Sequence, residues 1–318
     1  MDYVNICLGL LFVWLMVHGL ISLRRTKRLA PGPFPLPIIG NLHLLGDKPH
    51  KSLAQVAKTH GPIMNLKLGQ VNTVVISSSV LAKEVLQKQD LTFSNRFVPD
   101  AARACNHSYF SAVRLPVDSQ WRTLHKIMNS HIFSGKDYKL ELFTAGTDTA
   151  SNTLEWVMAE LLKNPHTLEK AQEELAQVVG RGKLVDGADV AKLPYLKCII
   201  KETFRLHPQV PFLIPCKVEE DVDFSGYFIP KDSQVLVNSW AIGRDSSLWE
   251  DPLDFTRERI CPVLPLAIWT VPVALSSLLN AFNWKLHGGI VPKDLDMEED
   301  FGITLAKTQP LLAIPIPL

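Results

Sequence analysis

One cysteine has neighbours that could make its thiol reactive. Cys261 follows Arg259 by two positions, precedes a proline and opens a long apolar run. A thiolate at the start of a helix is stabilised by the exposed N–H groups and the positive end of the helix dipole, and nearby arginines add positive charge. These residue types allow a nucleophile, a redox thiol or a metal ligand. The simpler interpretation is a buried, inert cysteine, because free cysteine often behaves as a small core hydrophobe.

A carboxylate and a guanidinium form a second candidate pair, Glu202 and Arg205. They stand three residues apart in a segment of helical periodicity, so their side chains share one helix face. On the residues alone, an exposed ion pair is the simpler interpretation. Such a pair contributes roughly a few tenths of a kcal/mol to stability.

Taken in chain order, these motifs resemble the cytochrome P450 family. In that family the haem-ligand loop reads F-x-x-G-x-R-x-C-x-G, and the cysteine thiolate is the axial ligand of haem iron. Arg259 and Cys261 match this loop, but its Phe and two Gly positions hold Asp254, Arg257 and Val263. The resemblance implies that Cys261 ligates the iron and that Arg259 helps to bind the cofactor.

The same resemblance gives Glu202 and Arg205 the role of the E-x-x-R pair, which is buried under the haem loop. In the family an arginine from a P-E-R-F segment completes this pair. Residues 252–260 resemble that segment, with Arg257 in place of its proline and Ile260 in place of its final phenylalanine, so two motifs claim Arg259. Because Arg259 and Cys261 are two residues apart, at most about 7 Å, one side chain is not expected to serve both motifs. We therefore expect a deletion near residue 259 that removed most of the haem loop.

The segment Ala145-Gly146-Thr147-Asp148-Thr149 resembles the centre of the oxygen-binding helix of the family. By that resemblance, small Ala145 and Gly146 leave room for dioxygen and substrate. Asp148 and Thr149 form the acid–alcohol pair that delivers protons. The simpler interpretation is that glycine and threonine merely weaken a helix and that Asp148 pairs with a distant base.

Two further positions concern the haem propionates. Trp121 matches the W-x-x-x-R helix that the family sends to a propionate, but His125 stands at the arginine position. Cys216 stands where related plant enzymes usually carry another propionate-binding arginine, in a segment, 211–217, that we expect to be a strand. The simpler interpretation of Trp121 is a core anchor of an ordinary helix.

An internal discontinuity lies near Lys139. Residues 130–134 resemble the end of the Trp121 helix region, yet the oxygen-binding segment begins about ten residues later. The family places several helices between these two pieces. We expect a large deletion here, with only the C-terminal half of the long helix retained.

The N-terminal region predicts a membrane anchor over residues 1–24. Residues 3–23 contain no charged residue apart from His18, which is about the span that a bilayer core requires. Basic residues follow at once, which predicts a cytosolic C-terminal side. A cleaved signal peptide is the alternative, but no small-residue cleavage site is present. Prolines in 31–41 then stiffen a basic and proline-rich hinge over 25–48, which resembles the hinge of microsomal P450s.

The elements between the motifs follow from periodicity and turn residues. We expect a helix over 50–60, strands over 63–69 and 73–77, a helix over 80–87 capped by Ser79, and a helix over 166–179. Residues 260–284 carry no charge and could form a second membrane span, but their three prolines favour a buried helix.

Composition excludes several classes of protein. The net charge is +1, so no nucleic-acid partner is expected. The five cysteines are odd in number and irregularly spaced, and no C-x-x-C pair occurs. Neither a disulfide framework nor a zinc site is therefore expected.

Together the resemblance implies a mainly α protein with small β-sheets, the cytochrome P450 fold, in a truncated catalytic domain over 49–318. It is similar to a plant microsomal group of geraniol 8-hydroxylase-like enzymes, judged from residues 297–304 and 240–245. The implied activity is hydroxylation of a small lipophilic substrate such as a monoterpenoid. The implied cofactor is haem b, with electrons from NADPH-cytochrome P450 reductase. The implied location is the endoplasmic reticulum, anchored once in its lipid bilayer with the globular part cytosolic.

Two alternatives belong to other classes. The chain could be a catalytically inactive, membrane-anchored relic or splice product, because two deletions, a damaged ligand loop and the loss of arginine at 125 and 216 all favour it. It could also bind the reductase as a decoy, because parts of the surface around the haem ligand survive. A redox signal without turnover of substrate would identify the decoy.

Overall fold

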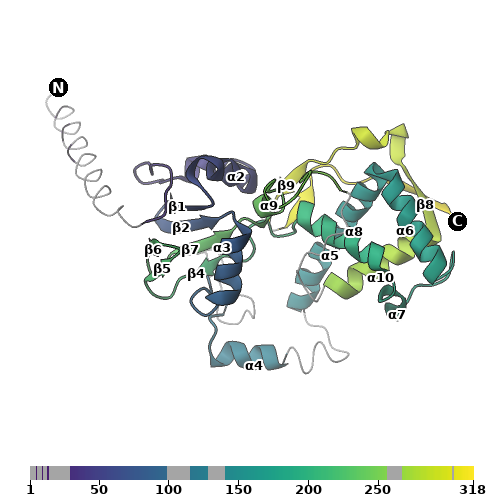
Figure 1. Ribbon diagram of the computed structural model, residues 1–318, viewed down its shortest axis with the longest axis horizontal. Coiled ribbons are helices and arrows are strands. Elements are labelled where there is room, and N and C mark those ends of the chain that lie inside the picture. Colours follow the sequence, from purple (N-terminus) through teal and green to yellow (C-terminus); the bar gives the residue numbers. More distant parts are fainter. Residues whose placement is uncertain are drawn as a thin grey trace. The chain divides into compact units, whose positions relative to one another are not determined.

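A computed structural model describes residues 29–98, 115–127, 140–255, 267–302 and 304–318, together with Asn5, Gly9 and Val13. The side chains of 140–146 and 267–270 are not described. The chain forms two compact units, each made of two stretches. The first comprises Met1–Ser134 and Phe212–Asn238, and the second Gly135–Pro211 and Ser239–Leu318. Figure 1 shows helices accompanied by small sheets, which confirms the predicted fold class at this level.

The first unit is built on a five-stranded sheet of order β1-β2-β7-β4-β3. Strands β1 (Ile63–Leu68) and β2 (Val71–Ile76) form an antiparallel hairpin, and β7 (Gln234–Val237) pairs parallel to β2. Helix α2 (Pro49–His60) packs on this sheet through Leu53, which joins Met64, Val75 and Leu236 in a buried cluster. The helix and the two strands predicted over 50–77 are therefore confirmed.

The predicted strand over 211–217 is shorter than expected. Only β4 (Cys216–Lys217) is strand, paired with β7 and with β3 (Asn95–Arg96). Pro211 and Pro215 lack the N–H groups that a longer ladder would need, and Leu213 has a φ of 54°. The remaining strands of this unit, β5 (Val222–Phe224) and β6 (Tyr227–Ile229), form a separate hairpin.

The expected helix over 80–87 begins and ends differently. Helix α3 (Ser79–Lys83) passes into the π-helical turn η2 (Glu84–Lys88). Ser78, not Ser79, is the N-cap residue, and it makes no side-chain hydrogen bond to the helix. The predicted cap was wrong because two serines precede the apolar residues, and either one satisfies the sequence rule.

The proline-rich hinge lies against the edge of β1, next to the short turn η1 (Leu42–Leu44). Asn41 is buried, and its Oδ1 accepts a hydrogen bond from the Lys67 backbone N–H at 2.8 Å. Gly40 has a φ of +60°, and a Cβ there would collide with the Lys67 carbonyl oxygen. Since only glycine avoids both conflicts, this position fixes the docking of the hinge.

The second unit is a group of helices around one apolar core. Its main members are α5 (Leu140–Lys163), α6 (Pro165–Val178), α8 (Pro194–Leu206) and α10 (Ala267–Ala281), with the short helices α7 (Gly187–Val190) and α9 (Ser239–Ile242) (Figure 1). From α10, Val271, Leu275 and Leu279 enter the core. The prediction of a buried helix is thus confirmed for α10, although Trp284 lies beyond it, in strand β8 (Phe282–Leu286).

Short antiparallel pairs complete the second unit. Strand β8 pairs with β11 (Ala313–Pro317), and β9 (Glu299–Phe301) pairs with β10 (Leu305–Lys307). The 3₁₀ turns η5 (His287–Gly289) and η6 (Pro292–Asp294) lie between β8 and β9 in the sequence. The β9–β10 hairpin contacts α5 through backbone and side-chain groups described below.

Candidate functional site

Glu202 and Arg205 form a buried, two-point ion pair on α8. Arg205 Nη2 lies 2.6 Å from Glu202 Oε1, and Arg205 Nε lies 2.8 Å from Oε2. The Arg205 side chain is 2% exposed and the Glu202 side chain is 4% exposed. The pair is therefore not the exposed ion pair that the spacing alone suggests, and its short, forked geometry is that of a strong charge-assisted contact.

Backbone carbonyl groups take up the remaining donors of Arg205. Its Nη1 donates to the carbonyls of Gly243 and Pro252, both at 2.6 Å, and its Nη2 donates to that of Asp254 at 3.0 Å. A guanidinium has five N–H donors, and each here has an acceptor. The Cζ atom of Arg205 lies over the ring of Trp249, 4.9 Å from the ring centroid. Arg205 thus joins α8 to two later segments of the same unit.

The N-terminus of α8 is held by a carboxylate from α6. Pro194 occupies the first turn, where its missing N–H costs nothing. Glu174 then accepts the N–H of Tyr195 at 2.8 Å and that of Leu196 at 2.9 Å, one on each oxygen. Two N–H groups that a helix cannot satisfy internally are thereby paired, with favourable charge at the positive end of the helix dipole.

Replacing Glu174 with alanine should destabilise the second unit by about 1–2 kcal/mol, because both N–H groups lose their acceptor. Urea unfolding in detergent, followed by circular dichroism, measures this change. The matched control is Glu173→Ala, which removes the exposed carboxylate next to it. Equal midpoints for the two variants would show that Glu174 does not cap α8.

The predicted acid–alcohol pair lies on α5. Asp148 is exposed and Thr149 half-buried, and Ala145 and Gly146 belong to the same continuous helix. The Thr149 carbonyl accepts a hydrogen bond from the Thr153 hydroxyl at 2.6 Å. The pair is therefore placed on a rigid helix, with Asp148 open to solvent.

A buried polar cluster that the sequence did not reveal lies at the C-terminal end of α8. His207 stacks on Trp156 of α5, with ring centroids 3.8 Å apart and planes at 5°. Its Nε2 donates to Glu160 Oε1 at 2.8 Å, and its Nδ1 lies 3.4 Å from Glu299 Oε1. His207, Trp156, Glu160 and Glu299 are all nearly inaccessible to solvent. We call these four residues the His207 cluster.

Arg244 supplies a cation to this cluster. Its Nη2 lies 3.4 Å from Glu299 Oε1, and Glu299 also accepts the indole N–H of Trp240 at 3.1 Å. Burial lowers the pKa of Arg244 to about 10, an effect that Glu299 partly opposes. Arg244 therefore stays charged at neutral pH and balances one of the two buried carboxylates.

In the first unit, Trp121 and His125 lie together on helix α4 (Ser119–Ile127). Their rings are 3.8 Å apart, and both side chains are half-buried. Asp118 accepts the backbone N–H of Trp121 at 2.8 Å, at the start of the helix. An indole N–H donor and an imidazole on one helix face are groups that can hold a carboxylate.

Cys216 has a cationic neighbour that the sequence did not indicate. Arg96, on the adjacent strand β3, places Nη1 3.7 Å from the Cys216 sulfur. Burial raises the pKa of the Cys216 thiol, and the Arg96 guanidinium partly opposes this shift. A guanidinium from another strand therefore stands beside Cys216. Only the pairing of β3 with β4, across a long sequence separation, reveals it.

Cys216 should react with iodoacetamide about tenfold more slowly than half-buried Cys198 at roughly pH 8, because burial keeps its thiol protonated. Peptide mass spectrometry after timed quenching measures both rates in one sample. Replacing Arg96 with glutamine removes the opposing cation and should slow Cys216 further. Rates equal to that of Cys198 would contradict the buried, neutral thiol.

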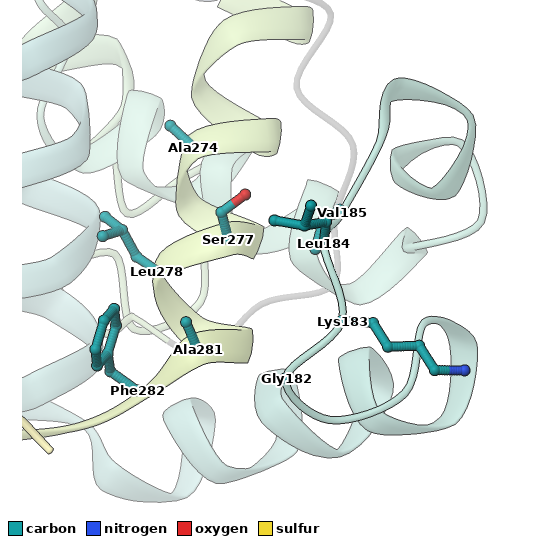
Figure 2. A pocket seen from close by; sticks show the side chains of 9 residues that line it. All are labelled: Gly182, Lys183, Leu184, Val185, Ala274, Ser277, Leu278, Ala281 and Phe282. Carbon is teal, nitrogen blue, oxygen red and sulfur yellow. The ribbon is translucent and has the colours of Figure 1, made fainter. Parts of the chain in front are cut away.

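An apolar pocket of about 430 Å³ lies elsewhere in the second unit. It is formed by loop 182–185, Phe282 and a face of α10 that includes Ala274, Ser277 and Ala281. Figure 2 shows Ser277 opposite Val185, with the Lys183 side chain extending away. None of the predicted site residues that the structure describes lines this pocket.

Two of the predicted site residues, Cys261 and Arg259, lie outside the described residues. The same holds for the predicted anchor, apart from the three isolated positions named above. Among the helices that the structure describes, none has the length and apolar character needed to cross a membrane.

The comparisons identify the class of protein: the chain belongs to the cytochrome P450 family. The family model described as Cytochrome P450 matches residues 30–141 and 136–260. Its members are monooxygenase oxidoreductases with a haem iron cofactor, and a reductase supplies their electrons from NADPH.

Similar proteins place the chain among plant cytochromes P450. Geraniol 8-hydroxylase of Catharanthus roseus is 41% identical over 493 residues, covering 100% of both chains. Geraniol 8-hydroxylase of Swertia mussotii is 39% identical over 492 residues, covering 100% of this chain and 99% of the relative. Geranylhydroquinone 3''-hydroxylase of Arnebia euchroma is 34% identical over 495 residues, covering 100% of this chain and 99% of the relative.

Proposed function

We propose that the chain is a haem-thiolate monooxygenase that hydroxylates a small lipophilic substrate such as a monoterpenoid. The observation that carries the proposal is the buried Glu202–Arg205 pair, whose five donors all have acceptors. By the family resemblance, this pair would be the structural core that lies under the cofactor. The substrate class rests on the relatives named geraniol 8-hydroxylase.

The residues present fit a haem group. Its two propionates are anionic, and both the Trp121 indole N–H and the Arg96 guanidinium are donors of the kind that binds carboxylates. Cys261 would be the axial ligand, and Arg259 would contact a propionate. When bound, haem supplies the activation of dioxygen.

The protein's own groups would move protons and leave room for the reactants. Asp148 would take protons from solvent, to which its carboxyl is open, and Thr149 would pass them on through its hydroxyl. Ala145 and Gly146 would leave space beside them. Glu202 and Arg205 would hold the surrounding backbone in place and take no part in proton transfer.

The proposed setting follows the family. Electrons would come from NADPH-cytochrome P450 reductase. Residues 1–24 would anchor the chain in the endoplasmic reticulum membrane, the hinge over 25–48 would connect the anchor to the body, and residues 49–318 would form a catalytic domain in the cytosol.

The proposal includes two internal deletions relative to the relatives. The alignment with the Catharanthus roseus enzyme runs over 493 residues, whereas this chain has 318, so many positions of the relative have no counterpart here. The family model also matches in two pieces, which meet at residues 136–141, and the second piece ends at 260. The alignment length supports missing segments, and the bounds of the two matched pieces are consistent with junctions near 139 and 259.

A reduced carbon-monoxide difference spectrum of membranes containing the full chain tests the proposal. We expect a thiolate-type Soret shift, because Cys261 is the proposed ligand, and we expect Cys261→Ser to lose it. Cys198→Ser is the matched control and should keep the shift. Absence of any haem signal, from chain shown by immunoblot to be in the membrane, would refute the enzyme and leave an inactive relic of the family.

A further inference from the structure

One face of α5 is tied to the rest of its unit by polar contacts. Asn152 Nδ2 donates to the Thr304 hydroxyl at 2.8 Å, and Trp156 Nε1 donates to the Leu305 carbonyl at 3.0 Å. One turn further on, Glu160 accepts from His207 at 2.8 Å. The first two contacts reach the β9–β10 hairpin region, and the third reaches the end of α8.

Thr149 lies on this same face. Residues 149, 152, 156 and 160 are separated by three, four and four positions, which is the spacing of one helix face. Thr149 and Glu160 are about 16 Å apart along the axis at 1.5 Å per residue. Because backbone hydrogen bonds join successive turns of a helix, contacts at the Glu160 end influence the direction of Thr149.

The contact with His207 is the costliest of the three to lose. Glu160 is 5% exposed and His207 is 5% exposed. Glu160 Oε2 also accepts from Asn164 Nδ2 at 3.3 Å, but Asn164 directly follows α5 and would turn with it. Separating His207 from Glu160 would leave the other oxygen of a buried carboxylate without this donor, so the structure resists such a rotation of α5. The contacts to Thr304 and Leu305 join neutral groups, whose loss costs less free energy.

The charges around the pair come from several elements. Glu299 of β9 lies 3.4 Å from the other ring nitrogen, Nδ1, and Arg244, which follows α9, lies 3.4 Å from Glu299. Lys307 of β10 lies 5.0 Å from the Trp156 ring, and burial lowers its pKa. His207 thus lies between two carboxylates, one of which contacts Arg244, while Lys307 lies beside the Trp156 ring that stacks on it.

We propose that His207 is a positioning residue: through Glu160 it fixes the rotation of α5 against α8 and thereby aims Thr149. The assignment of Thr149 as a proton-delivering group rests on the proposed function. The fixing of α5 by His207 does not, because it follows from the contacts within this unit alone.

Hydrogen exchange of the full chain in nanodiscs tests this role without requiring haem. His207→Phe keeps a ring to stack on Trp156 but removes the donor to Glu160. Amides of residues 148–153 on α5 should then exchange about tenfold faster, as expected for the loss of a hydrogen bond to a charged group. Amides of α6 residues 171–175 should be unchanged.

Rescue separates positioning from general packing. His207→Gln restores a side-chain N–H donor and removes the ring, so it should return the α5 amides to within about threefold of the original rates. His50→Phe makes the same chemical change at a buried histidine of the first unit and should leave α5 unaffected. If α6 accelerates as much as α5 in His207→Phe, or if glutamine does not rescue, His207 is only a packing residue.

A double-variant cycle gives an independent decision. Glu160→Met removes the acceptor and should accelerate the α5 amides, and adding His207→Phe to it should produce no further acceleration, because the contact between the two residues is already lost. Additive effects would overturn the proposal. Since the exchange pattern can support this role even when the haem spectrum is absent, failure of the proposed function and failure of the positioning role give different results.

Discussion

Replacing Arg205 with methionine should lower the free energy of unfolding by about 3–5 kcal/mol, the range seen when one partner of a buried ion pair is removed. The change leaves the Glu202 carboxylate buried without its partner. It also leaves three backbone carbonyls without their donor, those of Gly243, Pro252 and Asp254. Urea unfolding in detergent, followed by far-ultraviolet circular dichroism, measures the loss.

The chain offers a matched control for this prediction. Lys192 and Asp189 form another i,i+3 pair at 3.5 Å, but the lysine side chain is 65% exposed. Lys192→Met should change stability by less than about 0.5 kcal/mol, since exposed pairs contribute little. Arg205→Lys keeps the charge but cannot reach five acceptors, so it should resemble the methionine variant. A lysine variant as stable as the original would show that charge alone matters.

Trp156→Ala is the second substitution with a large expected effect, a loss of about 3–5 kcal/mol. Trp156 has 0% exposure, and the change removes its stacking on His207 and its hydrogen bond to the Leu305 carbonyl. The cavity would lie between α5 and the end of α8, where two carboxylates are already buried. The same urea titration measures this loss.

A conservative variant divides the effect into two parts. Trp156→Phe keeps a ring against His207 and removes only the indole N–H, so it should cost about 1–2 kcal/mol, the value of one hydrogen bond plus a small cavity. Trp121→Ala, at a half-buried indole of the first unit, should cost less than Trp156→Ala. If both alanine variants lose the same stability, the cluster at Trp156 is not a special anchor.

Local patterns predicted much of the fold. Helix α2, strands β1 and β2 and helix α6 follow from periodicity and from Gly–Pro and Asn–Pro stop signals, which act within a few residues. The predicted strand over 211–217 was mostly wrong, because the prolines there remove donors from the ladder. The cap at Ser79 was wrong by one residue, because two adjacent serines carry the same local signal.

In the candidate site, too, local contacts could be predicted from the sequence and long-range contacts could not. The pairing of Glu202 with Arg205 is local and could be predicted from spacing. The carbonyl acceptors of Arg205, the cap supplied by Glu174 and the contact between Arg96 and Cys216 join residues far apart in the sequence. A single sequence contains no signal for such contacts until the backbone brings them together. The burial of His207 could not be inferred for the same reason.

The way Arg205 is bound has a consequence for how this chain can change over generations. Three of its acceptors are main-chain carbonyls, which every amino acid possesses, and only Glu202 contributes a side chain. Substitutions at Asp254 can therefore accumulate without removing an acceptor. Residues of a sequence motif can therefore be substituted while the buried contacts around Arg205 are retained. Glu202 and Arg205, which contribute side chains, are expected to tolerate substitution least.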